Sequence, residues 1–129
     1  MEKNENQNSL YERLGRVEGI TAIVDDVVES HMTNPAIKAR FLPLKDDTGH
    51  FKEVRQHLIN FFIMGSGGPN QYTGKDMHTA HIGMNINQGE YMSVIDDIML
   101  ALDKNNIDEQ SRKDVLAILY SLKGQMIGV

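Results

Sequence analysis

The stretch GGPNQYTGKDMHTAHIGMN, residues 67–85, contains the residue types best suited to chemistry: a glycine pair, then His78 and His81 three residues apart. Glycine-rich loops cradle phosphates, whereas two imidazoles on one helical face hold a metal. The phosphate hypothesis fails, because the glycine spacing is one residue too long and Lys75 is followed by Asp76 rather than by Ser or Thr. The chemistry of this stretch is therefore that of its histidines.

Three hypotheses remain for the histidine pair. The two rings can hold zinc or copper directly with further ligands, or they can be structural, with His81 bonded to a backbone carbonyl and His78 in solvent. The third is a large flat ligand with a metal at its centre. Met77 and Met84 flank His81 on one helical side, and His57 lies beside the apolar stripe of an earlier helix. Two imidazoles from two helices, framed by Phe and Met, suit such a ligand, with Met84 as an alternative axial group.

The elements that must position these side chains are helices, because apolar residues recur at helical spacing. No two-residue alternation typical of a strand is found, so the sequence predicts an all-α fold. We expect helical segments within residues 9–15, 20–32, 34–41, 51–65, 77–83, 91–102 and 115–126, and a loop at 42–49. Ser9 with Glu12 forms a capping-box pattern, and Pro35 after Asn34 is typical of a helix start. Residues 1–8 predict a disordered tail and residues 9–129 a single domain.

The bulk composition excludes several functional classes. The chain has 129 residues, of which 40% are hydrophobic, and a net charge of −5. This charge argues against nucleic-acid binding. The absence of cysteine excludes disulfides, thiolate metal sites and covalent haem attachment through a Cys-x-x-Cys-His motif. No apolar run approaches the ~20 residues of a membrane span, so we expect no membrane association and a cytoplasmic protein.

With these residues in view, the chain resembles the truncated haemoglobins, specifically the first group. LYERLG at 10–15 resembles the opening of that family, and AIVDDVVESHMTNPAIKARF at 22–41 resembles its second and third helices. GGPNQYTGKDMHTAH at 67–81 resembles the linker and proximal-histidine segment, and it is the most specific match. The resemblance implies a two-over-two helical sandwich around haem b, with His81 as the proximal iron ligand.

The resemblance also implies which side chains contact the haem. Phe41 corresponds to a phenylalanine that packs on the porphyrin, and Met77 to a haem-contacting methionine. The expected contacts, besides these two and His81, are Val54, His57, Leu58, Phe61, Phe62, Tyr72 and Ile86. The expected metal ligands are His81 and His57. No histidine follows His81, so the cross-link from a last-helix histidine to haem seen in a few relatives is absent, and the haem should be extractable.

The departures from the family pattern lie on the side where gas binds. Gapless alignment puts Val28 where the family commonly has a tyrosine, and Val54 and Leu58 where glutamine is frequent. His57 remains, at a position where some relatives place a histidine that binds the iron itself. His57 can coordinate the sixth position, donate a hydrogen bond to bound O2, or face solvent, and we favour coordination. His31 is expected at the edge of the core, or as the distal group if its helix shifts in register.

The resulting functional hypotheses fall into three classes. The first is reversible binding of O2, CO and NO, for oxygen transport, storage or sensing, or for NO detoxification with an electron-donating reductase. The second is electron transfer or redox sensing by a six-coordinate haem. The third is a haem-free helical interaction module. We expect a monomer, with His50 and His78 in solvent.

Overall fold

The structure, a computed structural model, describes residues 9–69, 72, 79 and 83–128. The described chain is built from helices, and the predicted all-α class is confirmed. The elements are α1 (Leu10–Arg13), α2 (Arg16–Thr33), α3 (Lys38–Phe41), η2 (Leu42–Asp46), α4 (Thr48–Gly65), α6 (Gln88–Lys104), α7 (Glu109–Leu122) and η3 (Lys123–Gln125). The extended pairing recorded within these residues is an isolated parallel bridge between Ile86 and Ile127.

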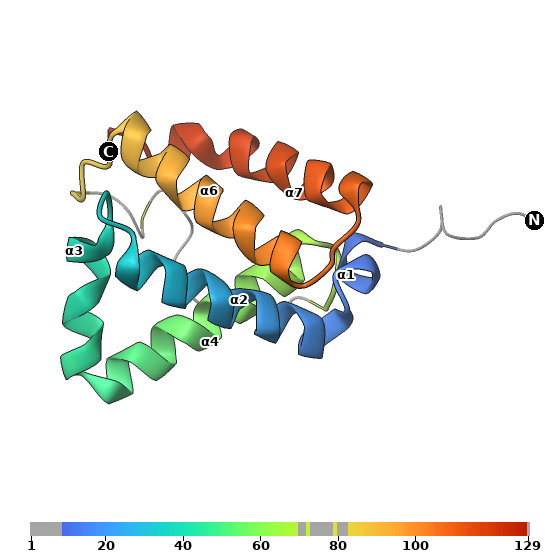
Figure 1. Ribbon diagram of the computed structural model, residues 1–129, viewed down its shortest axis with the longest axis horizontal. Coiled ribbons are helices and arrows are strands. Elements are labelled where there is room, and N and C mark those ends of the chain that lie inside the picture. The colour runs from blue at the N-terminus through green and yellow to red at the C-terminus, as the bar shows by residue number, and fades with distance from the viewer. Residues whose placement is uncertain (1–8, 70–71, 73–78, 80–82, 129) are drawn as a thin grey trace, which may run out of the picture.

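The four long helices form two crossed pairs. Helix α6 runs beside α7 (Figure 1). Helix α2 packs against both α4 and α6 and so lies between these two helices. Helix α1 contacts α2 and α7 and closes one end of the arrangement. This is the two-over-two arrangement that the family resemblance implies.

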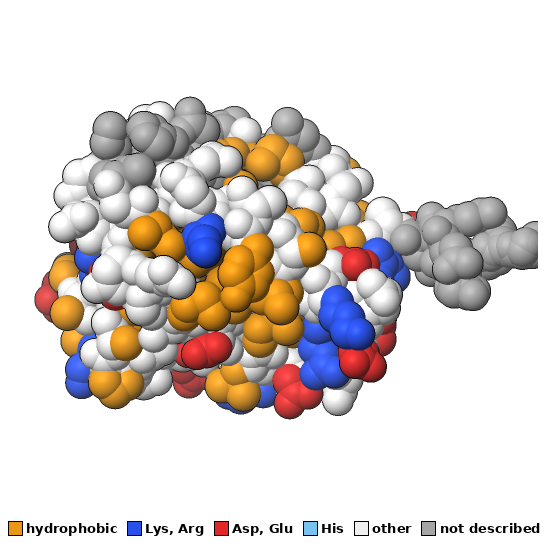
Figure 2. Space-filling model, turned by 90° about the horizontal axis from the view of Figure 1, so that it is seen from above, with side chains coloured by type: hydrophobic (Ala, Val, Ile, Leu, Met, Phe, Trp, Pro, Cys, Tyr) orange, Lys and Arg blue, Asp and Glu red, His pale blue; other side chains and the backbone are white. Residues whose placement is uncertain are grey.

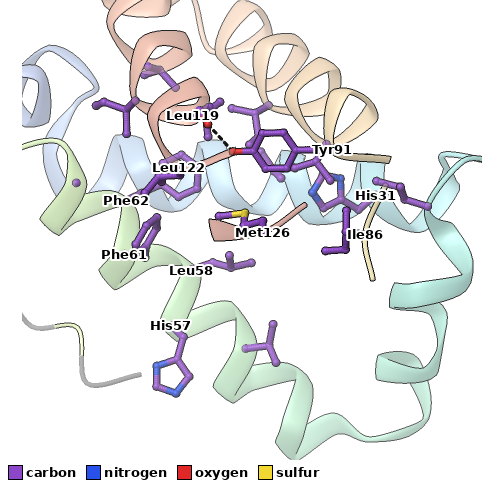
Figure 3. Close-up of a pocket in the computed structure, with 18 of the residues that line it drawn as sticks. His31, His57, Leu58, Phe61, Phe62, Ile86, Tyr91, Leu119, Leu122 and Met126 are labelled. Atoms are coloured by element: carbon purple, nitrogen blue, oxygen red, sulfur yellow. Dashed lines mark hydrogen bonds between the residues drawn. The ribbon is translucent and has the colours of Figure 1, made fainter. Parts of the chain in front are cut away.

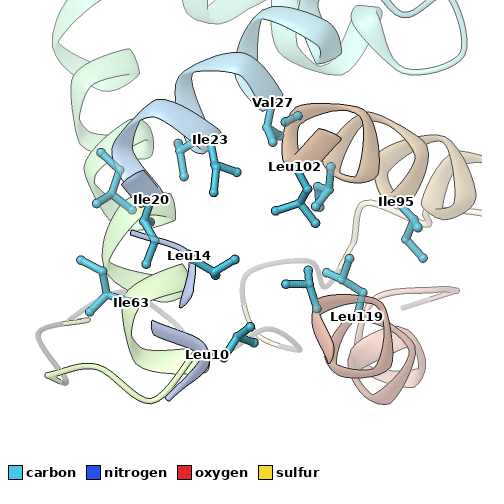
Figure 4. Packing of buried hydrophobic residues seen from close by; sticks show 14 of the residues in the cluster. Leu10, Leu14, Ile20, Ile23, Val27, Ile63, Ile95, Leu102 and Leu119 are labelled. Atoms are coloured by element: carbon cyan, nitrogen blue, oxygen red, sulfur yellow. The ribbon is translucent and has the colours of Figure 1, made fainter. Parts of the chain in front are cut away.

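The hydrophobic core lies where the pairs cross. Ile20, Ile23 and Val27 from α2 face Leu102 from α6 and Leu119 from α7 (Figure 4). Ile20 and Leu102 are both 0% exposed. Because burying a Val, Leu or Ile side chain contributes about 1.5–3 kcal/mol, this cluster fixes how α2 and α6 cross.

Local signals explain where most helices begin. Ser9 accepts a hydrogen bond from the backbone N–H of Glu12, and Asn87 and Glu90 form a reciprocal capping box that opens α6. Gly15 lies between α1 and α2 with φ +96°, a conformation that glycine adopts without strain. The chain therefore turns sharply into α2, directly after α1.

Two expectations for residues 34–49 are corrected. Helix α3 begins at Lys38 rather than at Pro35, because Asn34 accepts from the N–H of Ala36 and starts a turn instead. The expected loop is largely the η2 helix, and α4 begins at Thr48 because Asp47 accepts from the N–H of His50.

The surface mixes charged and apolar side chains. Figure 2 shows the molecule from above the view of Figure 1, with apolar side chains gathered between acidic and basic ones. Leu100 on α6 and Tyr120 on α7 are large apolar residues exposed at 48% and 46%. Among the helices that the structure describes, none has the length and apolar character needed to cross a membrane.

Candidate functional site

A cavity of about 320 Å³ lies between α4 and the α6–α7 pair. Aromatic and aliphatic side chains of α4 face those of α6 and α7 across it (Figure 3). Every described residue that the sequence predicted to contact a cofactor lines this cavity: Phe41, Val54, His57, Leu58, Phe61, Phe62, Tyr72 and Ile86. These residues come from four separate parts of the chain, so the fold brings together what the sequence kept apart.

Three predicted residues cannot be located in this way. Met77, His78 and His81 lie outside the residues that the structure describes. Met84 does line the cavity and is 38% exposed. Within the described part of the chain, no three His, Asp or Glu side chains converge in a way that could hold a bare metal ion.

His57 occupies an aromatic corner of the cavity wall. Its ring lies edge-on to that of Tyr72, with 5.8 Å between centroids, and Tyr72 lies similarly against Phe61 at 5.6 Å. The Nδ1 atom of His57 is buried, and it has no hydrogen-bond partner among the described residues. Because most buried polar atoms are hydrogen-bonded, such an atom needs an explanation.

Two residues of α2, Val27 and His31, line the cavity. Val28 is half-buried and packs against the core beside them. That Val28 corresponds to the tyrosine of the family stays a prediction.

His31 is more deeply buried than the expected position at the core edge, with 5% of its surface exposed. Its Nδ1 lies 2.7 Å from Oδ2 of Asp97 on α6, itself 8% exposed. Asn34 Nδ2 donates to both oxygens of Asp97 at 3.2 Å, and the Phe41 ring lies 4.8 Å from the His31 ring. Burial lowers the pKa of His31, and the hydrogen bond and charge of Asp97 oppose this effect without overcoming it.

A second polar pair in the cavity wall was missed from the sequence. Arg40 donates to both carboxylate oxygens of Glu90, at 2.8 and 3.1 Å. This hydrogen bonding lowers the pKa of Glu90, which also closes the capping box of α6. The capping pattern Asn87-x-x-Glu90 is readable in the sequence, but nothing local indicates a partner 50 positions earlier.

Tyr91 was predicted only as part of an apolar stripe. It is 3% exposed, lines the cavity, and donates its hydroxyl hydrogen to the backbone oxygen of Leu119. Burial raises the pKa of Tyr91. The bond ties α6 to α7 at the cavity wall (Figure 3).

Comparisons with known proteins agree with this geometry. A family model described as bacterial-like globin matches residues 9–128. A group 1 truncated haemoglobin of Tetrahymena pyriformis is 25% identical over 93% of this chain and 95% of the relative, and one of Nostoc sp. is 24% identical over 93% and 98%. The Fe(III) crystal structure of the Tetrahymena protein has a TM-score of 0.85, with 24% identity, and covers 95% of this chain and 100% of that one. A Synechococcus 2/2 haemoglobin with covalently attached haem has a TM-score of 0.78 and 20% identity, covering 92% and 95%.

The lowered pKa of His31 predicts a dependence of stability on pH. Below the ordinary pKa of 6.5 the unfolded chain binds a proton at this ring that the folded chain does not. The contribution of the neutral ring is complete above that pH and is lost as the pH falls toward the folded-state pKa.

As the pH falls, we therefore expect the free energy of unfolding to decrease more for the native chain than for the variant His31→Leu/Asp97→Asn. The difference should reach at most about 1.4 kcal/mol per pH unit. Urea unfolding at about pH 7.5 and about pH 5.5 measures this difference. The double variant keeps the Asn34 partner and leaves no buried charge. An equal loss of stability in both proteins would contradict the assignment.

Proposed function

The chain belongs to the bacterial-like globin family, and its fold is that of the truncated haemoglobins. From this premise we propose that its cavity binds haem b and reversibly binds O2, CO and NO. The observation that carries the proposal is the apolar cavity walled by the eight predicted contact residues. Haem would supply the iron at which a diatomic gas binds.

The residues of the cavity fit a flat apolar group. Its wall is mostly hydrocarbon, and Phe41, Phe61 and Phe62 contribute three aromatic rings to it. His57 also stands in this wall and brings to it an imidazole, a group that can bind a metal. Both observations support a large apolar ligand with a metal.

Individual residues have distinct roles in holding the haem. We propose His81 as the proximal iron ligand, because a neutral imidazole is the usual globin choice. His57 is proposed to reach the sixth position when no gas is bound. Phe41, Phe61 and Phe62 supply flat aromatic surface from the described cavity wall.

The gas side of the proposed site is mostly apolar. Val54 and Leu58 lie beside His57 in the cavity wall, and neither has a hydrogen to donate to bound O2. One neutral hydrogen bond contributes about 0.5–1.5 kcal/mol net, so His57 alone changes O2 affinity by about tenfold or less. We infer moderate rather than tight O2 retention.

The physiological role follows from what the site can retain. NO detoxification, in which O2 and NO give nitrate and leave ferric iron, requires an electron-donating reductase as partner. Electron transfer or redox sensing by a six-coordinate haem is the second candidate, favoured by the position of His57. We propose a cytoplasmic monomer, with haem that can be extracted because no histidine follows residue 81.

Removal of the proposed proximal ligand tests haem binding. We expect His81→Ala to lose stable haem retention, because the iron loses its one strong protein ligand. The matched control is His78→Ala, three residues away, which should retain haem as the native chain does. Gel filtration of haem-loaded protein, followed by absorbance, measures retention. Equal retention by all three proteins would remove the proximal assignment.

Removal of His57 tests the sixth ligand. The native ferric and ferrous proteins should have low-spin spectra, and His57→Ala should convert them to high spin, because an imidazole no longer binds the iron. His50→Ala serves as control, since His50 is exposed in the first turn of the same helix. A high-spin spectrum of the native ferric protein at neutral pH would refute coordination by His57.

A further inference from the structure

His31 is a buried cavity-lining group to which the proposed function gives no task. It lies on α2, whereas His57 lies on α4, and the two rings occupy different sides of the cavity (Figure 3). Buried polar side chains are costly in an apolar wall unless their hydrogen bonds are satisfied. The hydrogen bonds that His31 makes determine whether its ring presents a donor or an acceptor to the cavity.

The hydrogen bonds around Asp97 fix the direction of every donor. The backbone N–H of Ala36 donates to Asn34 Oδ1 at 3.0 Å, which sets the orientation of that amide. The Nδ2 of Asn34 therefore faces Asp97 and donates to both carboxylate oxygens. Both oxygens thus act as acceptors, and we assign to His31 Nδ1 the hydrogen that it shares with Oδ2.

The second ring nitrogen is then left with a lone pair. A neutral imidazole with hydrogen on Nδ1 has an unprotonated Nε2, which can accept a hydrogen bond but not donate one. Burial lowers the pKa of His31 and keeps the ring neutral near pH 7. Among the described residues, the recorded hydrogen bond to this ring is the one at Nδ1, and the Phe41 ring packs 4.8 Å away.

We propose that His31 presents a fixed hydrogen-bond acceptor, Nε2, to the cavity and thereby favours small neutral ligands that carry a hydrogen, such as hydrogen sulfide, over O2, CO and NO. This inference rests on the proposed function, because it concerns which ligands the haem site retains. O2, CO and NO present only lone pairs, which an unprotonated nitrogen does not bind. An S–H group donates to the same nitrogen. His31 is thus a specificity-determining residue, positioned by Asp97 and Asn34.

The ring tautomer can be measured without haem. Nitrogen-15 NMR of the histidine rings in the full-length protein distinguishes a nitrogen bonded to hydrogen from one with a lone pair. We expect His31 to have hydrogen on Nδ1 and none on Nε2 at neutral pH. A hydrogen on Nε2, with or without one on Nδ1, would overturn the proposal. The NMR spectrum shows which ring nitrogen of His31 carries the hydrogen even if the chain takes up no haem. Failure to take up haem would refute the proposed function instead.

Ligand affinities test the consequence in haem-loaded protein. For His31→Leu/Asp97→Asn we expect the affinity of the ferric protein for hydrogen sulfide to fall about two- to tenfold, the worth of one neutral hydrogen bond. Its affinity for NO should stay within about twofold. The control is Asp25→Asn/Arg55→Gln, which removes a short ion pair between α2 and α4 outside the cavity wall.

The control variant should bind both ligands as the native chain does. Unchanged hydrogen sulfide affinity in His31→Leu/Asp97→Asn, or an equal fall for both ligands, would contradict the proposal. The first result would mean that Nε2 does not reach the ligand. The second would mean that the substitutions act through the packing of the cavity.

Discussion

In a cavity walled almost wholly by hydrocarbon, each buried polar atom must find a partner or destabilise the fold. The protein itself satisfies several polar groups of this wall: His31 pairs with Asp97, Arg40 with Glu90, and the Tyr91 hydroxyl with the backbone oxygen of Leu119. The Nδ1 atom of His57 is the buried side-chain nitrogen that lacks a partner among the described residues. The two imidazoles of the described wall therefore differ: His31 is held by the fold, and Nδ1 of His57 has no partner among the described residues.

The same contacts connect the site to the architecture. Asp97 lies on α6 and His31 on α2, so their hydrogen bond joins two helices that also share the buried core around Ile20 and Leu102. The Tyr91 hydroxyl joins α6 to α7 beside the same cavity. The cavity wall is thus built by the packing that stabilises the helices, and the polar side chains in it are oriented by that packing rather than by flexible loops.

The sequence was sufficient for the helices, and the family resemblance indicated eight described residues that line the cavity. Strong apolar periodicity predicted the long helices, because only one face of each can be buried. The local pattern misled at Asn34, whose side chain starts a turn in place of the helix suggested by Pro35. It was incomplete at Asp47, whose capping bond starts α4 where a loop was expected.

What the sequence did not indicate at the site has a different cause. The sequence placed His31 at the edge of the core, whereas the ring is 5% exposed and lines the cavity. The pairing of His31 with Asp97 joins positions 66 residues apart. No spacing rule within one segment predicts such a pair, because it exists only when α2 and α6 have packed.

Titration of the purified full-length chain with haemin, followed by absorbance and thermal unfolding, tests the central claim most directly. The account predicts a Soret band that saturates at about one haem per chain and a midpoint of unfolding that rises with haem, because a ligand that binds only the folded state stabilises it. A spectrum that stays that of free haemin, with an unchanged midpoint, would contradict it.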